Sequence, residues 1–241
     1  MLRPHHVLAL LLAASVLLPA CSEKLSRRTG LSDRDLFAGG ERNLSRGKHD
    51  DAVEHFRLLL ERYPNSPLGP RAQLSLADAY MESKDYAEAE VAFDDFLRLY
   101  PADDNVAYAL SRKGDLLFRQ IGDPRRDQTR TRDAIRTYTR LLEKSPSGPY
   151  AASASARVAE LRNRLAQHET EVVKHYLTRK QFSSAETRSK RAIAEFPETR
   201  ALPSLLSLLA ESLAREGKPA EAAEVRKSLS EKFPGYGAKH P

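Results

Sequence analysis

The chain has 241 residues, of which 30% are charged and 7% are aromatic, and its formal net charge at pH 7 is +6. Basic and acidic residues are mixed along almost every segment, so the net charge alone does not indicate a nucleic-acid partner. The single cysteine excludes an internal disulfide framework.

The first twenty residues have the features of a secretory signal. Arg3 gives the start a positive charge, and residues 7–18 form an apolar run that is shorter than the about 20 residues needed to span a bilayer. The run leads into Leu18-Pro19-Ala20-Cys21, which resembles the lipobox of bacterial lipoproteins. We therefore predict a signal peptide at residues 1–20 and a covalent lipid, including palmitate, on Cys21.

The alternative for this region is an ordinary cleaved signal in which Cys21 has no role. Lipidation is favoured because Cys21 is the only cysteine in the chain and has no disulfide partner. Ser22 then favours the outer membrane, since the inner-membrane retention signal of enteric lipoproteins is Asp at this position. Residues 21–34 lack apolar periodicity and are predicted to be a lipidated tether on the periplasmic face of that membrane.

Five segments of the remaining chain share one pattern, an alanine followed by an apolar stretch and, twelve residues after the alanine, a proline. The alanines are Ala52, Ala89, Ala134, Ala185 and Ala222, and the prolines are Pro64, Pro101, Pro146, Pro197 and Pro234. In the first three segments an aromatic residue follows the alanine by four and shares its helical face, namely Phe56, Phe93 and Tyr138. Each proline is expected to end a helix, because it lacks a backbone donor and clashes with the preceding turn.

A second apolar-periodic stretch precedes each of these helices, and Gly47 and Gly217 mark the intervening turn in the first and last segments. This order of helix, turn, helix and proline is the tetratricopeptide layout, in which each hairpin buries its apolar face against its neighbours. We predict an all-α right-handed superhelix of about five tetratricopeptide hairpins, hence about ten helices, over residues 35–236. The repeats are placed at about 35–66, 70–103, 105–148, 150–199 and 203–236. Tyr150 to about Arg179 is expected to be one long helix, or two with a tight joint.

No residue pattern in the sequence indicates catalysis or a metal site. Ser45 and Lys48 have the spacing found in penicillin-binding enzymes, but the partner motifs of that family are missing. His168 and His175 lie seven residues apart without a third ligand at a suitable spacing. We therefore expect a protein that is not an enzyme and that has no cofactor apart from the lipid on Cys21.

Residues 124–132 form a locally basic stretch, PRRDQTRTR. The preferred interpretation is a solvated loop, and the alternative is a surface for an acidic protein or a phospholipid. A nucleic-acid partner is not expected, because an exported protein rarely meets one.

Many residues that the repeat pattern does not require resemble the outer-membrane assembly lipoprotein family BamD, also called ComL. In the first half these are Arg62-Tyr63-Pro64, Ala72-Gln73-Leu74, Ala79-Tyr80, Phe96, Arg98, Leu99, Pro101, Asn105, Tyr108, Arg112 and Gly114. In the long helix they are Tyr150, Ala154, Arg157, Leu161, Arg164, Leu165, Ala166, Glu169, Val172, Tyr176 and Arg179. The resemblance runs from about Asp35 to Pro234. The chain departs from it in a shorter insertion after Gly122, and in Ser189 and Arg226 where an aromatic residue is usual.

The resemblance implies a non-catalytic subunit of the outer-membrane β-barrel assembly complex. The N-terminal repeats would offer a concave surface to unfolded outer-membrane protein precursors, and the C-terminal repeats would dock on a BamA-type barrel subunit and other complex members. Holding an extended peptide in a groove requires shape and hydrogen bonds but no covalent step. The alternatives are another periplasmic tetratricopeptide lipoprotein scaffold, in cell-wall synthesis or polysaccharide export, and an enzyme or enzyme activator.

Arg188 is the candidate partner-binding residue. In the helix predicted at about 182–196, Ala185, Ala192 and Ile193 suffice for packing, so Arg188 and its basic neighbours are expected to point outward. The resemblance implies an arginine here, in the region that engages the barrel subunit, and a planar guanidinium can hold a carboxylate through two hydrogen bonds. The alternative is a solvated arginine on a basic helix face.

Overall fold

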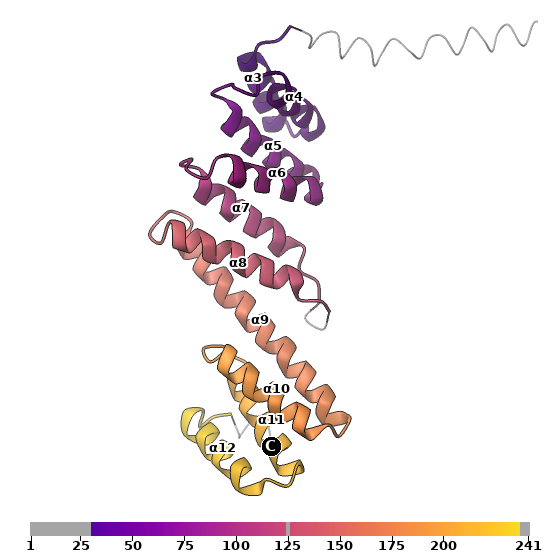
Figure 1. The fold of residues 1–241 in the computed structure, drawn as a ribbon, viewed down its shortest axis with the longest axis vertical. Coiled ribbons are helices and arrows are strands. Elements are labelled where there is room, and N and C mark those ends of the chain that lie inside the picture. The colour runs from indigo at the N-terminus through magenta and orange to yellow at the C-terminus, as the bar shows by residue number, and fades with distance from the viewer. Residues whose placement is uncertain (1–29, 124–125, 237–241) are drawn as a thin grey trace, which may run out of the picture. The chain divides into compact units, whose positions relative to one another are not determined.

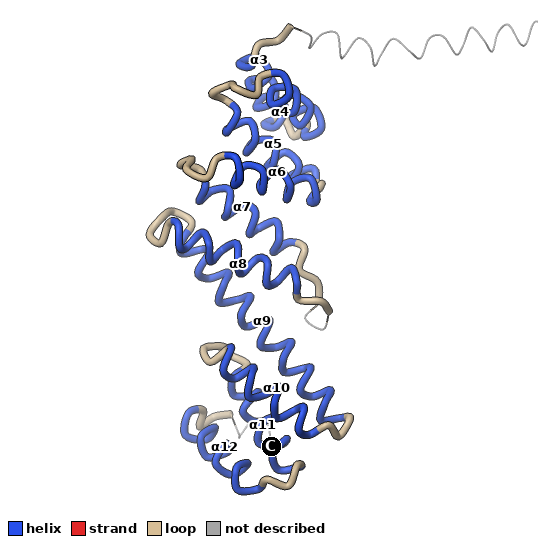
Figure 2. Tube along the Cα trace, in the orientation of Figure 1, coloured by secondary structure: helices blue, strands red, loops and turns tan. Residues whose placement is uncertain are grey.

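A computed structural model describes residues 30–123 and 126–236 (Figure 1). These residues form ten α-helices and no strand (Figure 2). The helices are α3 (Asp33–Ser45), α4 (His49–Arg62), α5 (Gly69–Ser83), α6 (Tyr86–Leu99), α7 (Val106–Arg119), α8 (Thr129–Lys144), α9 (Ala151–Thr178), α10 (Phe182–Glu195), α11 (Leu202–Arg215) and α12 (Pro219–Lys232). None of these described helices is long and apolar enough to cross a membrane. The predicted all-α class and hairpin arrangement are confirmed, and the right-handed superhelix stays a prediction.

The repeated alanines and prolines act as the sequence pattern predicts. All five alanines are fully buried. The helices α4, α6, α8, α10 and α12 each end two residues before the proline of their segment. The residue before a proline is disfavoured in the α conformation, which explains why each helix stops there.

Four turns inside the hairpins use a residue with positive φ, five positions before the buried alanine. Two of these residues are the predicted Gly47 and Gly217, with φ of 69° and 86°. The other two are Lys84 and Lys180, with φ of 70° and 58°. Glycine adopts this left-handed conformation without steric cost, whereas a lysine does not. The same turn is therefore built with different amounts of backbone strain.

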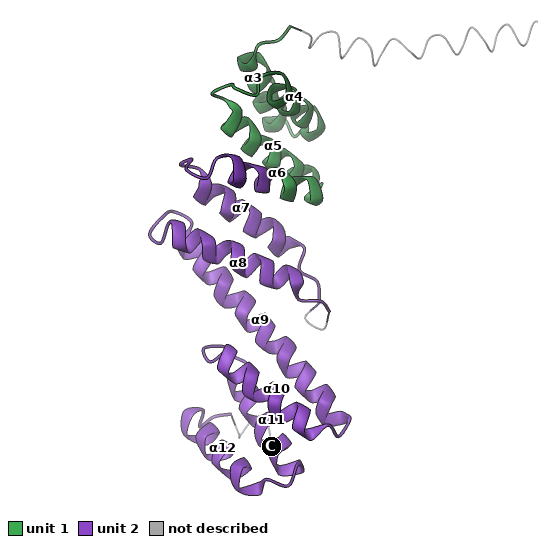
Figure 3. Ribbon diagram, viewed as in Figure 1, with its two compact units in different colours: residues 1–92 green, residues 93–241 purple. Residues whose placement is uncertain are grey.

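The chain divides into two compact units, residues 1–92 and 93–241 (Figure 3). In the first unit, Ser32 caps α3: its Oγ accepts from the Asp35 amide at 3.2 Å, and the Asp35 carboxylate accepts from the Ser32 amide at 3.1 Å. This capping box starts the helix at Asp33, so the last two residues predicted as tether belong to α3. The ring of Phe56 is fully buried against the backbone of Gly40, where a Cβ atom would lie 2.5 Å from the ring. The predicted signal peptide and Cys21 lie outside the described residues.

In the second unit, α8, α10 and α11 all pack against α9. This helix runs unbroken for 28 residues, so the one-helix alternative for this segment is correct. Residues 150–196 contain neither glycine nor proline, so no residue here breaks a helix from within. Because a helix rises about 1.5 Å per residue, α9 gives about 42 Å of continuous support for its neighbours.

Candidate partner-binding site

One face of α9 carries a buried row in which residues lie four apart, and one of its members is an acid. The row is Leu161, Leu165, Glu169, Val173 and Leu177. Four-residue spacing keeps side chains on one helix face, so Glu169 occupies a place where an apolar residue is expected. Its side chain is only 4% exposed. A carboxylate buried to this degree is stable only if it is paired and hydrogen-bonded.

Arg188 of α10 is that partner. Its Nη2 donates to Glu169 Oε1 at 2.8 Å and its Nε donates to Glu169 Oε2, so the guanidinium holds the carboxylate through two hydrogen bonds. The Arg188 side chain is 26% exposed. The expectation that it points outward is therefore wrong, because the buried carboxylate draws the guanidinium toward α9. Two of its five N–H groups are used in this pair.

Polar contacts add to the apolar packing of α10, in which Phe182 and Ile193 take part. Ser189 is fully buried and its Oγ donates to the backbone oxygen of Ala185 at 2.7 Å. Glu186 accepts from Lys190 Nζ at 2.6 Å and from Lys218 Nζ at 2.8 Å. Hydrogen bonds from Lys190 and then Lys218 lower the pKa of Glu186 to about 2. Charged contacts thus fix α10 to its neighbours around Arg188.

An open groove runs along another part of α9. Two hollows of about 490 Å³ and 520 Å³ share Gln167 and Arg200 in their walls. The first is also lined by Phe118, Ile121, Glu160 and Arg164, and the second by Asp123, Thr170, Glu171 and Lys174. The groove is therefore formed by α9, the end of α7 and the start of α11, and its walls combine polar and apolar surface.

Arginine side chains supply hydrogen-bond donors to this groove. Arg164 Nη2 donates to the backbone oxygen of Gly122, while its Nε is buried and has no hydrogen-bond partner among the described residues. Asn163 Oδ1 accepts from the Arg200 amide at 2.7 Å, which fixes the loop that carries Arg200. These contacts fix the walls of the groove.

Sequence reasoning missed Glu169 as the partner of Arg188. The signal was present, since a charged residue interrupts an apolar row spaced by four, and such a residue requires a partner of opposite charge. From the sequence, the spacing of the histidines did not indicate a metal site. In the described ranges, no group of three His, Cys, Asp or Glu residues could hold a metal ion. Cys21 lies outside those ranges.

Sequential helix hairpins, with an open groove and a half-buried arginine pair, define a helical-repeat protein. The family model described as YfiO, an outer membrane lipoprotein, matches residues 30–229, and the chain belongs to this family.

Proteins of three bacteria illustrate the relationship, and each is called outer membrane protein assembly factor BamD. The Caulobacter vibrioides protein is 30% identical, over 95% of this chain and 76% of its own. The proteins of Neisseria meningitidis serogroup A and Haemophilus influenzae are 29% and 28% identical, over 83% and 91% of this chain and 78% and 87% of theirs. Among solved structures, the TPR2AB domain of yeast Sti1 is 19% identical with a TM-score of 0.46, over 85% of this chain and 78% of that one.

Proposed function

We propose that this chain is a non-catalytic outer membrane protein assembly factor, a lipoprotein subunit of the complex that inserts β-barrel proteins. The family match carries the proposal, because it extends over residues 30–229 and so over nearly all described helices. Relatives that match 83–95% of the chain bear the name of such a factor. A scaffold of this kind binds and positions other proteins, which needs surfaces rather than a reacting side chain.

The barrel subunit of the complex is the partner proposed for α10, through Arg188. The Glu169 carboxylate fixes the guanidinium in one orientation. An arginine held in this way loses little side-chain entropy when it binds a partner's carboxylate, and a planar fork can serve two acceptors at once. Glu169 is then a positioning residue for Arg188.

The test is binding of the purified periplasmic domains of the barrel subunit to wild type and to three variants. Arg188→Lys keeps the positive charge but loses the planar guanidinium. Glu169→Gln keeps the side-chain volume but weakens the hydrogen bonds that orient Arg188. Arg191→Ala is the matched control, because Arg191 is exposed on the same helix. We expect about tenfold weaker binding for Arg188→Lys, about three- to tenfold for Glu169→Gln, and little change for the control.

If all four proteins bind the barrel subunit's domains with equal affinity, Arg188 is not part of the interface. Failure of the barrel subunit to co-purify with the tagged wild-type chain would contradict the proposed function itself, and would favour a scaffold in cell-wall synthesis or polysaccharide export. The two outcomes are separate, because the first concerns one side chain and the second concerns the whole complex.

Membrane attachment through Cys21, with residues 1–20 removed as a signal peptide and the repeats at 35–236, completes the proposal. The lipobox-like sequence Leu18–Cys21 supports it. Cys21→Ser should abolish palmitate labelling and leave the protein soluble in the periplasm or uncleaved in the inner membrane. Unchanged labelling would contradict the anchor. Unfolded precursors of outer-membrane proteins are the ligands proposed for the N-terminal repeats, in line with the assembly function.

A further inference from the structure

The exposed face of α8 carries three arginines at four-residue intervals. Arg132, Arg136 and Arg140 are all exposed, and we call them the arginine stripe. At about 1.5 Å per residue the stripe is about 12 Å long on one helix face. Arg126 is exposed in the loop before the helix and extends the basic surface.

The opposite face of α8 is firmly buried, so the stripe is presented on a rigid support. Thr131, Ala134, Tyr138 and Leu141 are at most 1% exposed. The Tyr138 hydroxyl donates to Asp115 Oδ1 of α7 at 2.7 Å. Burial, and then this hydrogen bond, raise the pKa of Tyr138 above its ordinary range, so the hydroxyl stays a donor. The orientation of the stripe is therefore set by the fold of the second unit.

The sequence of α8 works against its own helix dipole. Its first turn contains no acid but includes Arg130 and Arg132. The amino end of a helix carries a partial positive charge, so basic residues there are electrostatically unfavourable. The Asp127 carboxylate accepts from the Thr129 amide at 3.2 Å and offsets part of this cost, but the helix itself gives no reason for the two arginines.

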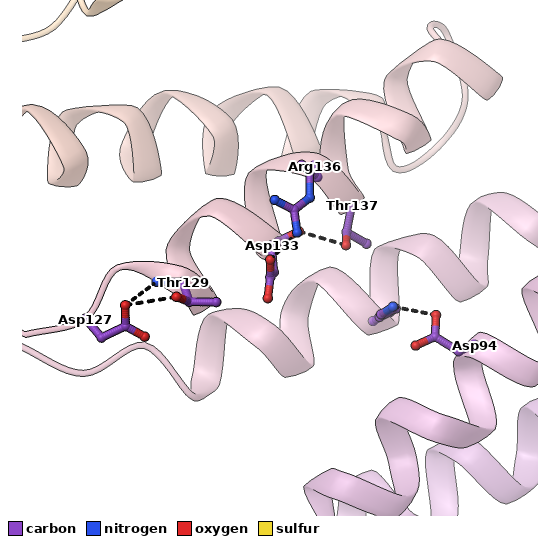
Figure 4. A network of polar contacts seen from close by, with 7 residues as sticks. Asp94, Asp127, Thr129, Asp133, Arg136 and Thr137 are labelled. Atoms are coloured by element: carbon purple, nitrogen blue, oxygen red, sulfur yellow. Dashed lines mark hydrogen bonds and ion pairs between the residues drawn. The ribbon is translucent and has the colours of Figure 1, made fainter. Parts of the chain in front are cut away.

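Only part of this charge is compensated inside the protein. Arg136 pairs with Asp133 one turn earlier, and Asp127 accepts from the Thr129 hydroxyl at 2.9 Å beyond the end of the stripe (Figure 4). Arg132 and Arg140 make no ion pair within residues 30–123 and 126–236. The stripe therefore retains the capacity to bind carboxylates from outside.

We propose that the arginine stripe is a docking surface for an acidic segment of a partner protein, one that presents carboxylates at about four-residue spacing. Complementary charge selects this occupant, because arginine binds carboxylates through paired hydrogen bonds. The exposed Asp127 and Glu143 lie just beyond its two ends, and they would repel a continuous anionic surface but not a segment of limited length. Val91 and Leu99 are the large apolar side chains exposed in the described chain, and both belong to α6, so α8 has none to insert into a bilayer.

The experiment measures fluorescence anisotropy of a labelled helical peptide of about 20 residues with glutamate at every fourth position. The protein is the full-length chain in detergent, as wild type, as the triple variant Arg132→Gln, Arg136→Gln, Arg140→Gln, and as a charge-matched control. That control is Arg226→Gln, Lys227→Gln, Lys232→Gln, three exposed residues of α12. A second peptide of the same composition carries its glutamates in one block. Vesicles of phosphatidylethanolamine and phosphatidylglycerol test a lipid surface.

We expect the stripe variant to lose on the order of tenfold in affinity for the regularly spaced peptide, and the control less than about twofold. The block peptide should bind the wild type more weakly than the spaced one. Equal losses in the two variants, or no preference for the spaced peptide, would show that net charge alone acts and would overturn the proposal. Vesicle binding that depends on the stripe, without peptide binding, would overturn it in favour of a membrane surface. The inference stands independently of the proposed assembly function.

Discussion

The first and fourth hairpins of this protein share the repeat pattern but differ at the position four residues after the buried alanine. In the first, formed by α3 and α4, the ring of Phe56 lies four residues after Ala52 and fills the space against Gly40. In the fourth, formed by α9 and α10, the equivalent position after Ala185 is Ser189, which bonds to its own helix. At this position one hairpin has an aromatic ring packed on a glycine backbone, whereas the other has a hydrogen-bonded serine near an apolar cluster of Val173, Leu177 and Ala185.

Between the first and the fourth hairpin, the larger side chain moves from the second helix to the first. Gly40 lies sixteen residues before Phe56, and Val173 lies sixteen residues before Ser189, so the smaller residue is on the first helix in one hairpin and on the second helix in the other. Gly114 and Tyr138 repeat the first solution in the third hairpin. The total side-chain volume is thus kept, as close packing requires. The exchange leaves α10 with a small polar residue, Ser189, directly after Arg188, which pairs with Glu169.

The largest expected effect comes from removing the aromatic ring of the first hairpin. Phe56→Ala should lower the free energy of unfolding by about 3–5 kcal/mol, because it leaves a cavity over Gly40. Ser189→Ala, at the equivalent position, should cost about 1 kcal/mol or less, since it removes one hydrogen bond and no bulk. Chemical denaturation of both variants measures the difference. Similar losses would mean that the two interiors are not energetically distinct.

The pattern of alanines and prolines was sufficient to predict the hairpins, because small residues and helix-ending residues act locally. The repeat also located the turn glycines Gly47 and Gly217. It could not show that Lys84 and Lys180 take the same conformation, since the turn forces it on them through the packing of the flanking helices.

The direction of Arg188 could not be read from α10 alone. Its partner, Glu169, lies nineteen residues earlier on another helix, so the contact depends on tertiary structure. When only the apolar residues of α10 are considered, Arg188 is predicted to be solvated. The unbroken α9 likewise required the structure, because the sequence permitted both one helix and two.

The second prediction concerns the asymmetry of the buried pair. Arg188→Ala should cost about 2–4 kcal/mol, because it leaves the Glu169 carboxylate buried without a partner. Glu169→Gln should cost only about 1–2 kcal/mol, since the Arg188 side chain is already partly exposed and can turn to solvent. Arg188→Glu would place two carboxylates together and should lower the melting temperature. Denaturation of the single variants measures the order, and a larger loss for Glu169→Gln than for Arg188→Ala would contradict it.

The third prediction concerns pH and the polar contacts of α10. The pKa of Glu186 is lowered to about 2 in the folded protein by Lys190 and Lys218. The stabilisation is therefore complete above the unfolded-state pKa of about 4.3 and is lost as the pH falls toward 2. Wild type should exceed Glu186→Gln by about 1 kcal/mol at neutral pH, and this difference should shrink below about pH 4. Urea denaturation across this range tests it. A difference that stays constant down to pH 2 would exclude an ionised Glu186 as its source.

The smallest expected effect concerns the hairpin turns, which have either a lysine or a glycine as the residue with positive φ. Lys180 holds a φ of 58° at the place where Gly217 holds 86° in the last hairpin. Lys180→Gly should remove the steric cost of the left-handed conformation, about 1 kcal/mol, while the greater freedom of glycine in the unfolded chain offsets part of that gain. The net result should be a stabilisation of about 0.5 kcal/mol. Gly217→Ala introduces the same strain and should destabilise by about 1 kcal/mol. Lys180→Ala is the control, since it removes the long side chain but keeps the strain, and it should be nearly neutral. If Lys180→Ala stabilises as much as Lys180→Gly, the side chain of Lys180 and not its backbone is the source of the cost.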